Sequence, residues 1–532
     1  MSIETASQFT DPSAPPAAPE DLTGHSRLAR NVLTSWAGHL VFFIVGFIMP
    51  RMTDRYLGQE ALGVWDFGWS LVSYFGLVQS GIGGAVSRYV AKYRATGDTH
   101  SLNTAVSSAQ CFQTGAAVFA LGLSVAAAVL VPSLFSERLG EHAGEARWVV
   151  LLLGSSIAVQ MLMSPFDGVL QGCHRWDIRA FITAGSHALT VCAMIIALLL
   201  HGGLTSMAAV TLCGALLTEV LRVSAAHAVC KGLAVRPHKA KWGVLVEMLA
   251  FGGKSLLWPV SRVLLYQTNS LLIAAFVGPA ALAFYSRPRS LVGQTETFMN
   301  RFSFVLAPAA SALHAQDSHG DVRRLLLRSL ELAMYISLPL VLLLAIMGDL
   351  IVRLWMGSRY EPGLLIVILA VGHLTDMVTQ PAVSILTGMN RHGRVGIINL
   401  ASAVSSAILG FLTLRVLAWG LLGAALALTL PLTVASGVWL PLHFCRVLGV
   451  PLRKLLGACL APVLWSVPFA SCLLAARVVL GHSPLLALVL GMGTGGAVMG
   501  VAYWRHVIPC RLRDRVTGML GRAVSVCRPS QR

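Results

Sequence analysis

Long apolar runs alternate with short polar segments along almost the whole chain. Runs such as 149–159 and 485–501 contain no charged residue. A helix that crosses a bilayer needs about 20 mostly apolar residues, because no water is present there to satisfy its backbone. The pattern therefore predicts an all-α polytopic membrane protein with about fourteen transmembrane helices, at residues 29–50, 61–84, 104–131, 147–170, 180–201, 203–226, 248–277, 286–308, 326–347, 362–388, 395–416, 420–443, 456–479 and 484–504.

The two ends of the chain lack such runs. The first 26 residues are rich in Pro, Ala, Ser and acid and carry no apolar stretch behind a basic one, which predicts a disordered tail and no cleaved signal peptide. The predicted domains are a disordered cytoplasmic tail (1–28), an N-terminal lobe of spans 1–6 (29–227), a cytoplasmic linker (228–247), a C-terminal lobe of spans 7–12 (248–445), spans 13 and 14 (446–504) and a basic cytoplasmic tail (505–532).

Three short patterns recur at a nearly constant offset. LGQEALGVW from Leu57 is answered by VGPAALAFY from Val277, ATGDTHSL from Ala95 by SHGDVRRL from Ser318, and the turn at Pro165 by the one at Pro381. The offsets of 216 to 223 residues predict two six-helix lobes related by a direct repeat. Because six is even, both lobes enter the membrane in the same orientation, which makes the repeat parallel. Spans 13 and 14 are two extra C-terminal helices.

Composition agrees with a membrane protein, since 55% of the residues are hydrophobic and only 12% are charged. The formal net charge of +17 is largely topological, because 26 of the 40 Lys and Arg residues fall in segments assigned to one side. The positive-inside rule makes that side the cytoplasm, so both termini are predicted to lie in the cytoplasm of a bacterial inner membrane. We expect contacts with anionic membrane lipids and none with nucleic acid.

The chain contains ten cysteines, all in spans or on the predicted cytoplasmic side, which indicates no structural disulfides. No spacing typical of a metal site occurs, and the glycine clusters follow no predicted strand, so no cofactor is expected.

Several of these segments resemble a known family. The quoted pieces are 31–35 before a first span that ends at Pro50, LGQEALGVW, GIGGAVSRYVAKYRATGD, the second-half FVGPAALAFY, and the turns at Pro165 and Pro381. Together they resemble the polysaccharide transporter family, the lipid-linked oligosaccharide flippases of the multidrug/oligosaccharidyl-lipid/polysaccharide exporter superfamily. The resemblance covers residues 28 to 505, and His174 with Arg175 is a departure in an otherwise similar turn. It implies secondary transport and a central cavity lined by spans 1, 2, 7 and 8.

Span 7 carries the clearest polar stripe inside the membrane. At 100° per residue its polar and aromatic residues share a face about 120° wide; they are Lys254, Trp258, Arg262, Tyr266 and Asn269. Arg262 lies about 21 Å along the helix, too deep to reach the interface easily. It is the first candidate for a functional cation, and a structural ion pair is the alternative.

The other three polar spans extend this picture. Span 8 presents Arg287 and Arg301 on one face with Glu296 roughly opposite, span 2 presents Asp66, and span 1 presents His39. His39, Asp66 and Glu296 are candidates for coupling or for polar cavity positions, although a lone histidine is also typical of helix packing. Together the charged residues of these four spans predict a cationic cavity. Such a cavity suits a diphosphate because arginine pairs with phosphate oxygens. Its aromatic residues are candidates for stacking on sugars or for ordinary packing.

We therefore predict a flippase, and not an enzyme, that moves a polyprenyl-diphosphate-linked oligosaccharide across the cytoplasmic membrane by alternating access. The cargo is an O-antigen or exopolysaccharide repeat unit, and the expected partners are that lipid-linked glycan, membrane lipids, and the glycan polymerase and export components. Alternatives are a multidrug or cation antiporter of the same superfamily, a membrane-embedded glycan polymerase or ligase, and a scaffold subunit. The antiporter calls for buried carboxylates, and the polymerase for a larger outer loop than residues 132–146 offer.

Overall fold

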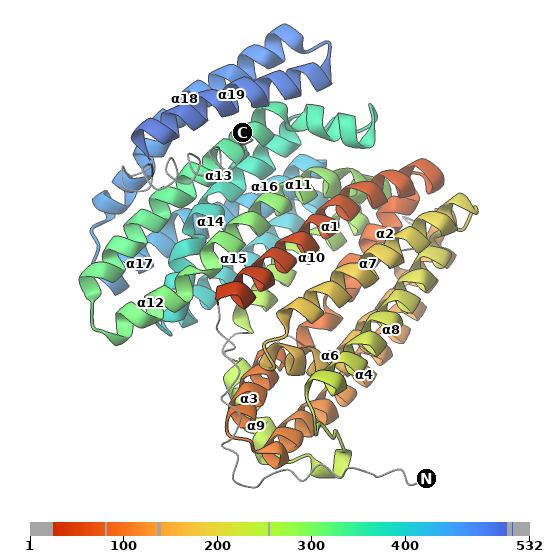
Figure 1. Ribbon diagram of the computed structural model, residues 1–532. Coiled ribbons are helices and arrows are strands. Elements are labelled where there is room, and N and C mark those ends of the chain that lie inside the picture. Colours follow the sequence, from red (N-terminus) through yellow and green to blue (C-terminus); the bar gives the residue numbers. More distant parts are fainter. Residues whose placement is uncertain (1–24, 80–81, 136–139, 254–255, 508–512, 514–532) are drawn as a thin grey trace, which may run out of the picture.

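Every regular element that the structure describes is helical (Figure 1). The structure is a computed structural model, and it describes residues 25–79, 82–135, 140–253, 256–507 and 513. Most of both predicted tails lies outside these residues. The elements up to the middle of the chain are α1 (His25–Leu57), α2 (Gln59–Val72), η1 (Phe75–Gln79), α3 (Gly83–Ala95), α4 (Thr99–Leu134), η2 (Gly140–His142), α6 (Ala143–Gly172), α7 (Trp176–Leu199), α8 (Leu204–Val229), η3 (Pro237–Lys239) and α9 (Trp242–Gly253).

The second half begins with α10 and ends with a helical hairpin. Its elements are α10 (Leu257–Phe276), α11 (Pro279–Phe304), α12 (Leu306–Ala315), α13 (His319–Met356), α14 (Leu364–Gly388), α15 (Gly393–Phe411), η4 (Leu412–Val416), α16 (Gly420–Val434), η5 (Ala435–Trp439), α17 (Leu440–Leu448), α18 (Leu452–Leu480) and α19 (Pro484–His506).

Ten helices among the described residues are long and apolar enough to cross a membrane, so the chain is a multi-pass membrane protein. They coincide with predicted spans 3–6 and 9–14. The other four predicted spans fall on α1, α2, α10 and α11, and the count of fourteen stays a prediction. Helix α11 is long enough to cross a membrane but carries four charged residues, which are Arg287, Arg289, Glu296 and Arg301. Helix α2, with 14 residues, is too short by itself to cross a membrane.

Two predicted spans are interrupted. Span 2 was expected as one helix over 61–84, but α2 ends at Val72 and α3 begins only at Gly83. The described part of the segment between them contains Gly76, and glycine is a poor helix former. Span 7 likewise divides, since α9 ends at Gly253 and α10 begins at Leu257. Helix α9 packs on α3 and α4, so residues 248–253, predicted to start the C-terminal lobe, pack with the N-terminal one (Figure 1).

The packing of the helices repeats between the two halves. Helix α1 packs on α7 as α10 packs on α15, α4 on α6 as α13 on α14, α6 on α8 as α14 on α16, and α3 on α6 as α12 on α14. Equivalent helices occur in the same order, which makes the two lobes a parallel repeat. Helices α18 and α19 stand outside it: they pair with each other, pack on α13, and lie on the side of the C-terminal lobe away from α4, α6 and α8 (Figure 1).

The turns repeat as well as the helices. Five pairs of residues with positive φ are separated by 216 to 220 residues: Gly58 and Gly278, Gly97 and Asp317, His174 and Asn390, His201 and Ala418, and Gly232 and Gly449. The first pair has φ values of 91° and 121°, outside the range that side chains readily adopt. Both glycines directly precede helices that approach the other lobe, α2 and α11.

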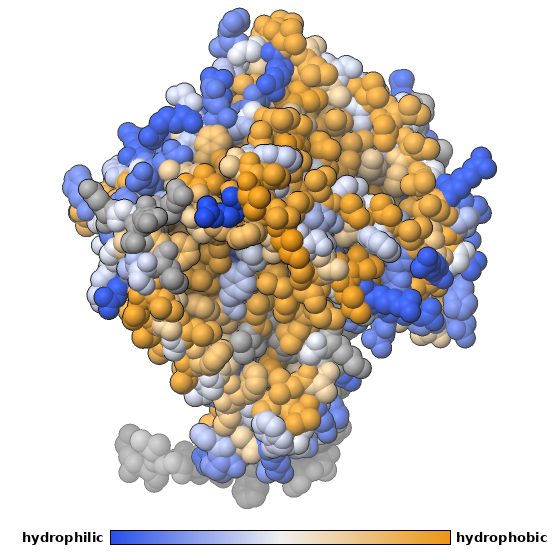
Figure 2. Space-filling model, turned by 180° about the vertical axis from the view of Figure 1, so that it is seen from behind, coloured by the Kyte–Doolittle hydropathy of each residue, from blue (hydrophilic) through white to orange (hydrophobic). Residues whose placement is uncertain are grey.

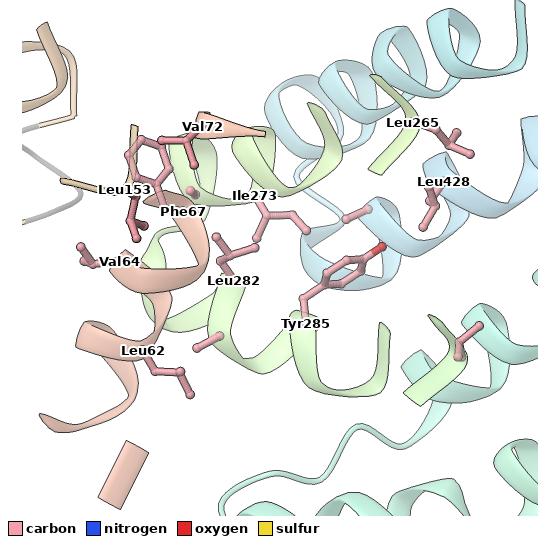
Figure 3. Close-up of a cluster of buried hydrophobic side chains, with 14 of the residues drawn as sticks. Leu62, Val64, Phe67, Val72, Leu153, Leu265, Ile273, Leu282, Tyr285 and Leu428 are labelled. Carbon is pink, nitrogen blue, oxygen red and sulfur yellow. The ribbon is translucent and has the colours of Figure 1, made fainter. Parts of the chain in front are cut away.

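A buried apolar core joins the lobes where α2 meets α10 and α11. Figure 3 shows Phe67 of α2 near Ile273 of α10 and Leu282 of α11, and all three side chains are almost fully buried. The surface is apolar as well: apolar residues cover most of the face shown in Figure 2. An apolar surface of this extent is expected where helices face lipid.

Candidate functional site

A polar cavity of about 410 Å³ lies between the two lobes. Helix α2 forms the N-terminal wall with Asp66 and Trp69, and helices α10 and α11 form the C-terminal wall with Tyr266 and Arg289. The polar lining also includes five serines, two glutamines and a threonine: Ser70, Ser73, Ser270, Ser286, Ser290, Gln267, Gln294 and Thr297. We call this the central cavity. Its walls offer many hydrogen-bonding groups, so a polar ligand fits it better than an apolar one.

Arg262 lies beside the cavity in a buried ion pair. Its guanidinium donates to Asp376 Oδ2 at 2.9 Å and to Glu296 Oε2 at 3.2 Å. The two carboxylates come from α14 and α11, so the arginine joins three helices of the C-terminal lobe. Gln380 Nε2 lies 3.4 Å from both oxygens of Asp376. A charge this deep is stable only when paired and hydrogen-bonded, and Arg262 satisfies that condition.

Arg289 shares Glu296 with Arg262 and also faces the central cavity. Its guanidinium is 3.3 Å from Glu296 Oε2 and 4.0 Å from the centre of the Tyr266 ring. Tyr266 also lies under Arg262 and donates its hydroxyl to Glu296 at 3.3 Å. Only 17% of the Arg289 side chain is exposed, and its Nε has no hydrogen-bond partner among the described residues. Arg289 is thus the cavity-wall cation with unused hydrogen-bonding capacity.

His373 completes this cluster from α14. Its Nδ1 donates to the carbonyl oxygen of Leu369 at 2.6 Å, and its Nε2 lies 3.2 Å from Glu296 Oε1. A neutral ring that donates through Nδ1 presents a lone pair at Nε2, and a lone pair repels a carboxylate. At this distance the two side chains are neighbours, but Nε2 has no hydrogen-bond partner among the described residues.

The lobes are joined at one end of the cavity by charged and aromatic contacts. Asp66 of α2 pairs with the buried Arg287 of α11. Asp54 of α1 accepts from Tyr360 at 2.9 Å and from Arg359 at 3.2 Å. Two hydrogen bonds from side chains to backbone carbonyl groups lie beside them. Trp355 Nε1 donates to the carbonyl oxygen of Phe47 at 2.6 Å, and the Arg51 guanidinium donates to the carbonyl oxygen of Met356. We call the contacts between α1 and the α13–α14 connection the latch.

The structure brings only part of the predicted site together. Arg262, Tyr266 and Glu296 form one cluster, and Asp66 with Arg287 forms the interlobe pair. Asn269 is 3% exposed and donates to Tyr285 Oη and to the Ala424 carbonyl oxygen, so it lies in a helix interface and not on the cavity wall.

The remaining predicted residues lie elsewhere or cannot be placed. Arg301 lines a largely apolar cavity of about 600 Å³ between α1, α11, α13 and α19, which adjoins the central cavity at Gln294 and Thr297. Trp258 is partly exposed, 5.8 Å from the Arg262 guanidinium. Lys254 lies outside the described residues, and so does the side chain of His39 on α1.

The sequence predicted an excess of positive charge in the cavity, but in the structure arginines and carboxylates of the cluster are paired. Arg262 and Arg289 face Glu296 and Asp376, and Arg287 faces Asp66, so each described arginine of the cluster has a carboxylate partner. Sequence reasoning missed Arg289, Asp376 and His373. Arg289 was within reach, because it lies seven residues before Glu296 and therefore on the same helix face. Asp376 and His373 lie on α14, in a span whose average pattern is strongly apolar.

Two repeated lobes around a polar cavity, embedded by apolar helices, define a membrane transporter. A family model described as "Polysaccharide biosynthesis protein" matches residues 95–364, about half of the chain. The chain belongs to this family.

One relative and two solved structures extend this result. A Shigella flexneri protein, provisionally named an O-antigen transporter, is 21% identical over 432 residues, which is 79% of this chain and 99% of that protein. An inward-facing multidrug resistance MATE family transporter of the MOP superfamily gives a TM-score of 0.62 at 14% identity, covering 80% of this chain and 98% of that one. The lipid II flippase MurJ, in an inward closed conformation, gives 0.62 at 13% identity, covering 91% and 100%. The two structures show the fold.

Proposed function

We propose that this protein is a flippase that carries a polyprenyl-diphosphate-linked oligosaccharide from the cytoplasmic to the outer leaflet of a bacterial inner membrane. Family membership and the O-antigen name of the Shigella flexneri relative support a glycan cargo. The cargo in this proposal is an O-antigen or exopolysaccharide repeat unit. Glycan polymerase and export components would act on it after transport.

The observation that carries the proposal is Arg289 on the wall of the central cavity. Its Nε donor has no partner among the described residues, and its single carboxylate partner, Glu296, also serves Arg262. The guanidinium has five N–H donors and lines the cavity, so a diphosphate oxygen can accept from a donor that Glu296 does not use, without removing the carboxylate from Arg262. Arginine suits this task because its planar fork matches two phosphate oxygens and keeps its charge when buried.

Alternating access assigns a direction to the two ends of the cavity. The latch joins segments that the positive-inside rule places outside, near Asp54 and Tyr360, and the lobes meet there. In the proposed cycle the state with the latch formed is closed to the outside and loads cargo from the cytoplasmic leaflet. Opening the latch and closing the opposite end then releases cargo outside.

The test is flipping of a fluorescent undecaprenyl-diphosphate disaccharide in proteoliposomes, read by quenching from outside. Arg289→Ala should lower the rate by about tenfold or more, the loss of one charged hydrogen bond. Arg289→Lys should retain part of the activity because it keeps the charge. Arg324→Ala is the matched control, since Arg324 is 77% exposed and pairs only with Asp321 among the interactions seen. Absence of flipping by the wild-type protein would refute the proposal, and flipping at the wild-type rate in Arg289→Ala would refute the role given to Arg289.

A cation antiporter is the second candidate, and one observation favours it: Glu296 and Asp376 are buried carboxylates beside the cavity. Two arginines already neutralise them, which leaves little attraction for a cationic drug. The same proteoliposomes, tested for proton-driven uptake of tetraphenylphosphonium, separate the two functions. Uptake that depends on Glu296, without glycan flipping, would establish the antiporter.

A further inference from the structure

A second cavity, of about 530 Å³, lies inside the N-terminal lobe between α1, α2, α6, α7 and α8. Nothing in the proposed transport step uses it. Trp69 of α2 lines both this cavity and the central cavity, so one indole stands between them. We call this second cavity the side pocket. The two cavities are therefore neighbours, with the Trp69 side chain as their common wall.

One end of the side pocket is a balanced ion network. Arg222 pairs with Glu219 on α8 and lies 3.3 Å from Asp167 of α6. Arg179 of α7 donates to the same Asp167 oxygen at 2.8 Å. Two arginines thus face two carboxylates, and the pocket end has no net charge. Such a network attracts neither a free cation nor a free anion strongly.

Two polar groups of the lining are nevertheless unpartnered. Glu219 is 2% exposed, and its Oε2 has no hydrogen-bond partner among the described residues. The Thr183 hydroxyl of α7, also in the pocket lining, has none either. Buried polar atoms left without partners cost free energy, and native proteins satisfy nearly all of them. A carboxylate oxygen accepts only, so the missing partner of Glu219 is a donor. Both oxygens have almost no exposed area, so a ligand in the pocket reaches them after a rotation of the Glu219 and Thr183 side chains.

Part of the remaining wall of the pocket is aromatic. Trp65 and Trp69 meet edge to face with centres 6.3 Å apart. Phe42 of α1 stacks on His187 of α7 at 4.3 Å. Flat rings beside hydrogen-bonding groups suit a ligand that is apolar on its faces and polar around its edge.

We propose that the side pocket binds a saccharide residue of the cargo while the diphosphate stays at Arg289. A sugar ring is uncharged, presents C–H groups to aromatic faces, and carries hydroxyl groups that donate to Glu219 and Thr183. An organic cation would also suit aromatic walls, but Arg222 and Arg179 offset the carboxylates that would attract it. This inference rests on the proposed flippase function and adds which part of the glycan the protein holds.

The test compares two probes on the purified full-length chain in lipid nanodiscs, by isothermal titration: farnesyl diphosphate, and farnesyl diphosphate carrying one N-acetylglucosamine. The sugar should strengthen binding to the wild type. Thr183→Val and Glu219→Gln should each reduce that gain roughly five- to tenfold, about the worth of a hydrogen bond, while leaving farnesyl diphosphate unchanged. Thr183→Val is expected to fold normally, because its hydroxyl has no protein partner to lose.

The control variants separate the two proposals. Glu331→Gln makes the same change as Glu219→Gln at an ion pair with exposed Arg328 and should alter neither probe. Arg289→Ala should weaken both probes. If Arg289 matters but the sugar gain is absent, or survives in both pocket variants, the side-pocket inference is wrong and the flippase proposal stands. If neither probe binds, both fail. Displacement by tetraphenylphosphonium that depends on Glu219 would identify a cation pocket instead.

Discussion

Arg262 shows how a single buried charge is held in a membrane protein. It joins α10 to α11 and α14 through Glu296 and Asp376, and Tyr266 covers one face of its guanidinium. Almost all of its surroundings are protein. Its contacts are those of a residue that positions Glu296, and through Glu296 it positions Arg289.

Removing this guanidinium should therefore destabilise the fold. Arg262→Leu leaves two buried carboxylates with less compensation, which is expected to cost on the order of 3–5 kcal/mol. Thermal unfolding of the purified protein measures the effect. The double variant Arg262→Leu with Asp376→Leu removes a charge of each sign and should recover most of the stability. A fully stable Arg262→Leu protein that no longer flips glycan would instead make Arg262 a residue that contacts cargo.

At the scale of elements, α2 and α11 bring the two lobes into close backbone contact. A Cβ atom on Gly63 would lie 1.8 Å from the carbonyl oxygen of Pro279, and a backbone carbonyl cannot move aside as a side chain can. The interface therefore depends on a glycine at this position. The Asp66–Arg287 pair and the apolar contacts of Phe67 lie along the same face of α2.

Gly63→Ala should force α2 away from α11 and destabilise the protein by about 1–3 kcal/mol or more. Gly122→Ala on α4 is the matched control, because a Cβ there would meet no heavy atom within 4 Å. The control should unfold at the wild-type temperature or slightly above it, since alanine favours a helix. Equal unfolding temperatures for the two variants would show that the lobes tolerate a wider separation.

At the scale of the whole molecule, the two lobes must move relative to each other if alternating access operates. Gln59 Nε2 donates to the Ala280 carbonyl oxygen at 3.0 Å and so marks a point where the lobes touch. Gln110 Nε2 makes the same kind of contact with Leu162 at 2.7 Å, but within the N-terminal lobe. These two contacts form a matched pair for cross-linking.

In a chain whose ten native cysteines are replaced, a disulfide between Gln59→Cys and Ala280→Cys should stop glycan flipping, and a reductant should restore it. The same bond between Gln110→Cys and Leu162→Cys should leave flipping nearly unchanged, because both residues move together. The readout is the flipping rate in proteoliposomes before and after reduction. Undiminished flipping with the interlobe bond intact would contradict transport by relative motion of the lobes.

The sequence by itself determined the helical membrane class, ten of the spans, the parallel repeat and the family. These features depend on the length of each apolar run, on the turn residues and on the offset between the repeated segments. All three can be read from the sequence without knowing how neighbouring helices pack. Helix periodicity also placed Arg287 and Glu296 on opposite faces of α11, and in the structure the first meets α2 and the second meets α10 and α14.

Only the tertiary structure decided which charges meet. Asp376 lies 114 residues from Arg262, and no periodicity within one helix reveals how another helix is rotated against it. The predicted cationic face therefore became a set of paired charges, Asn269 turned into a helix interface, and Arg289 emerged as the cavity cation. The breaks in spans 2 and 7 were also decided by packing, because short helices such as α3 and α9 gain stability from their neighbours rather than from their own length.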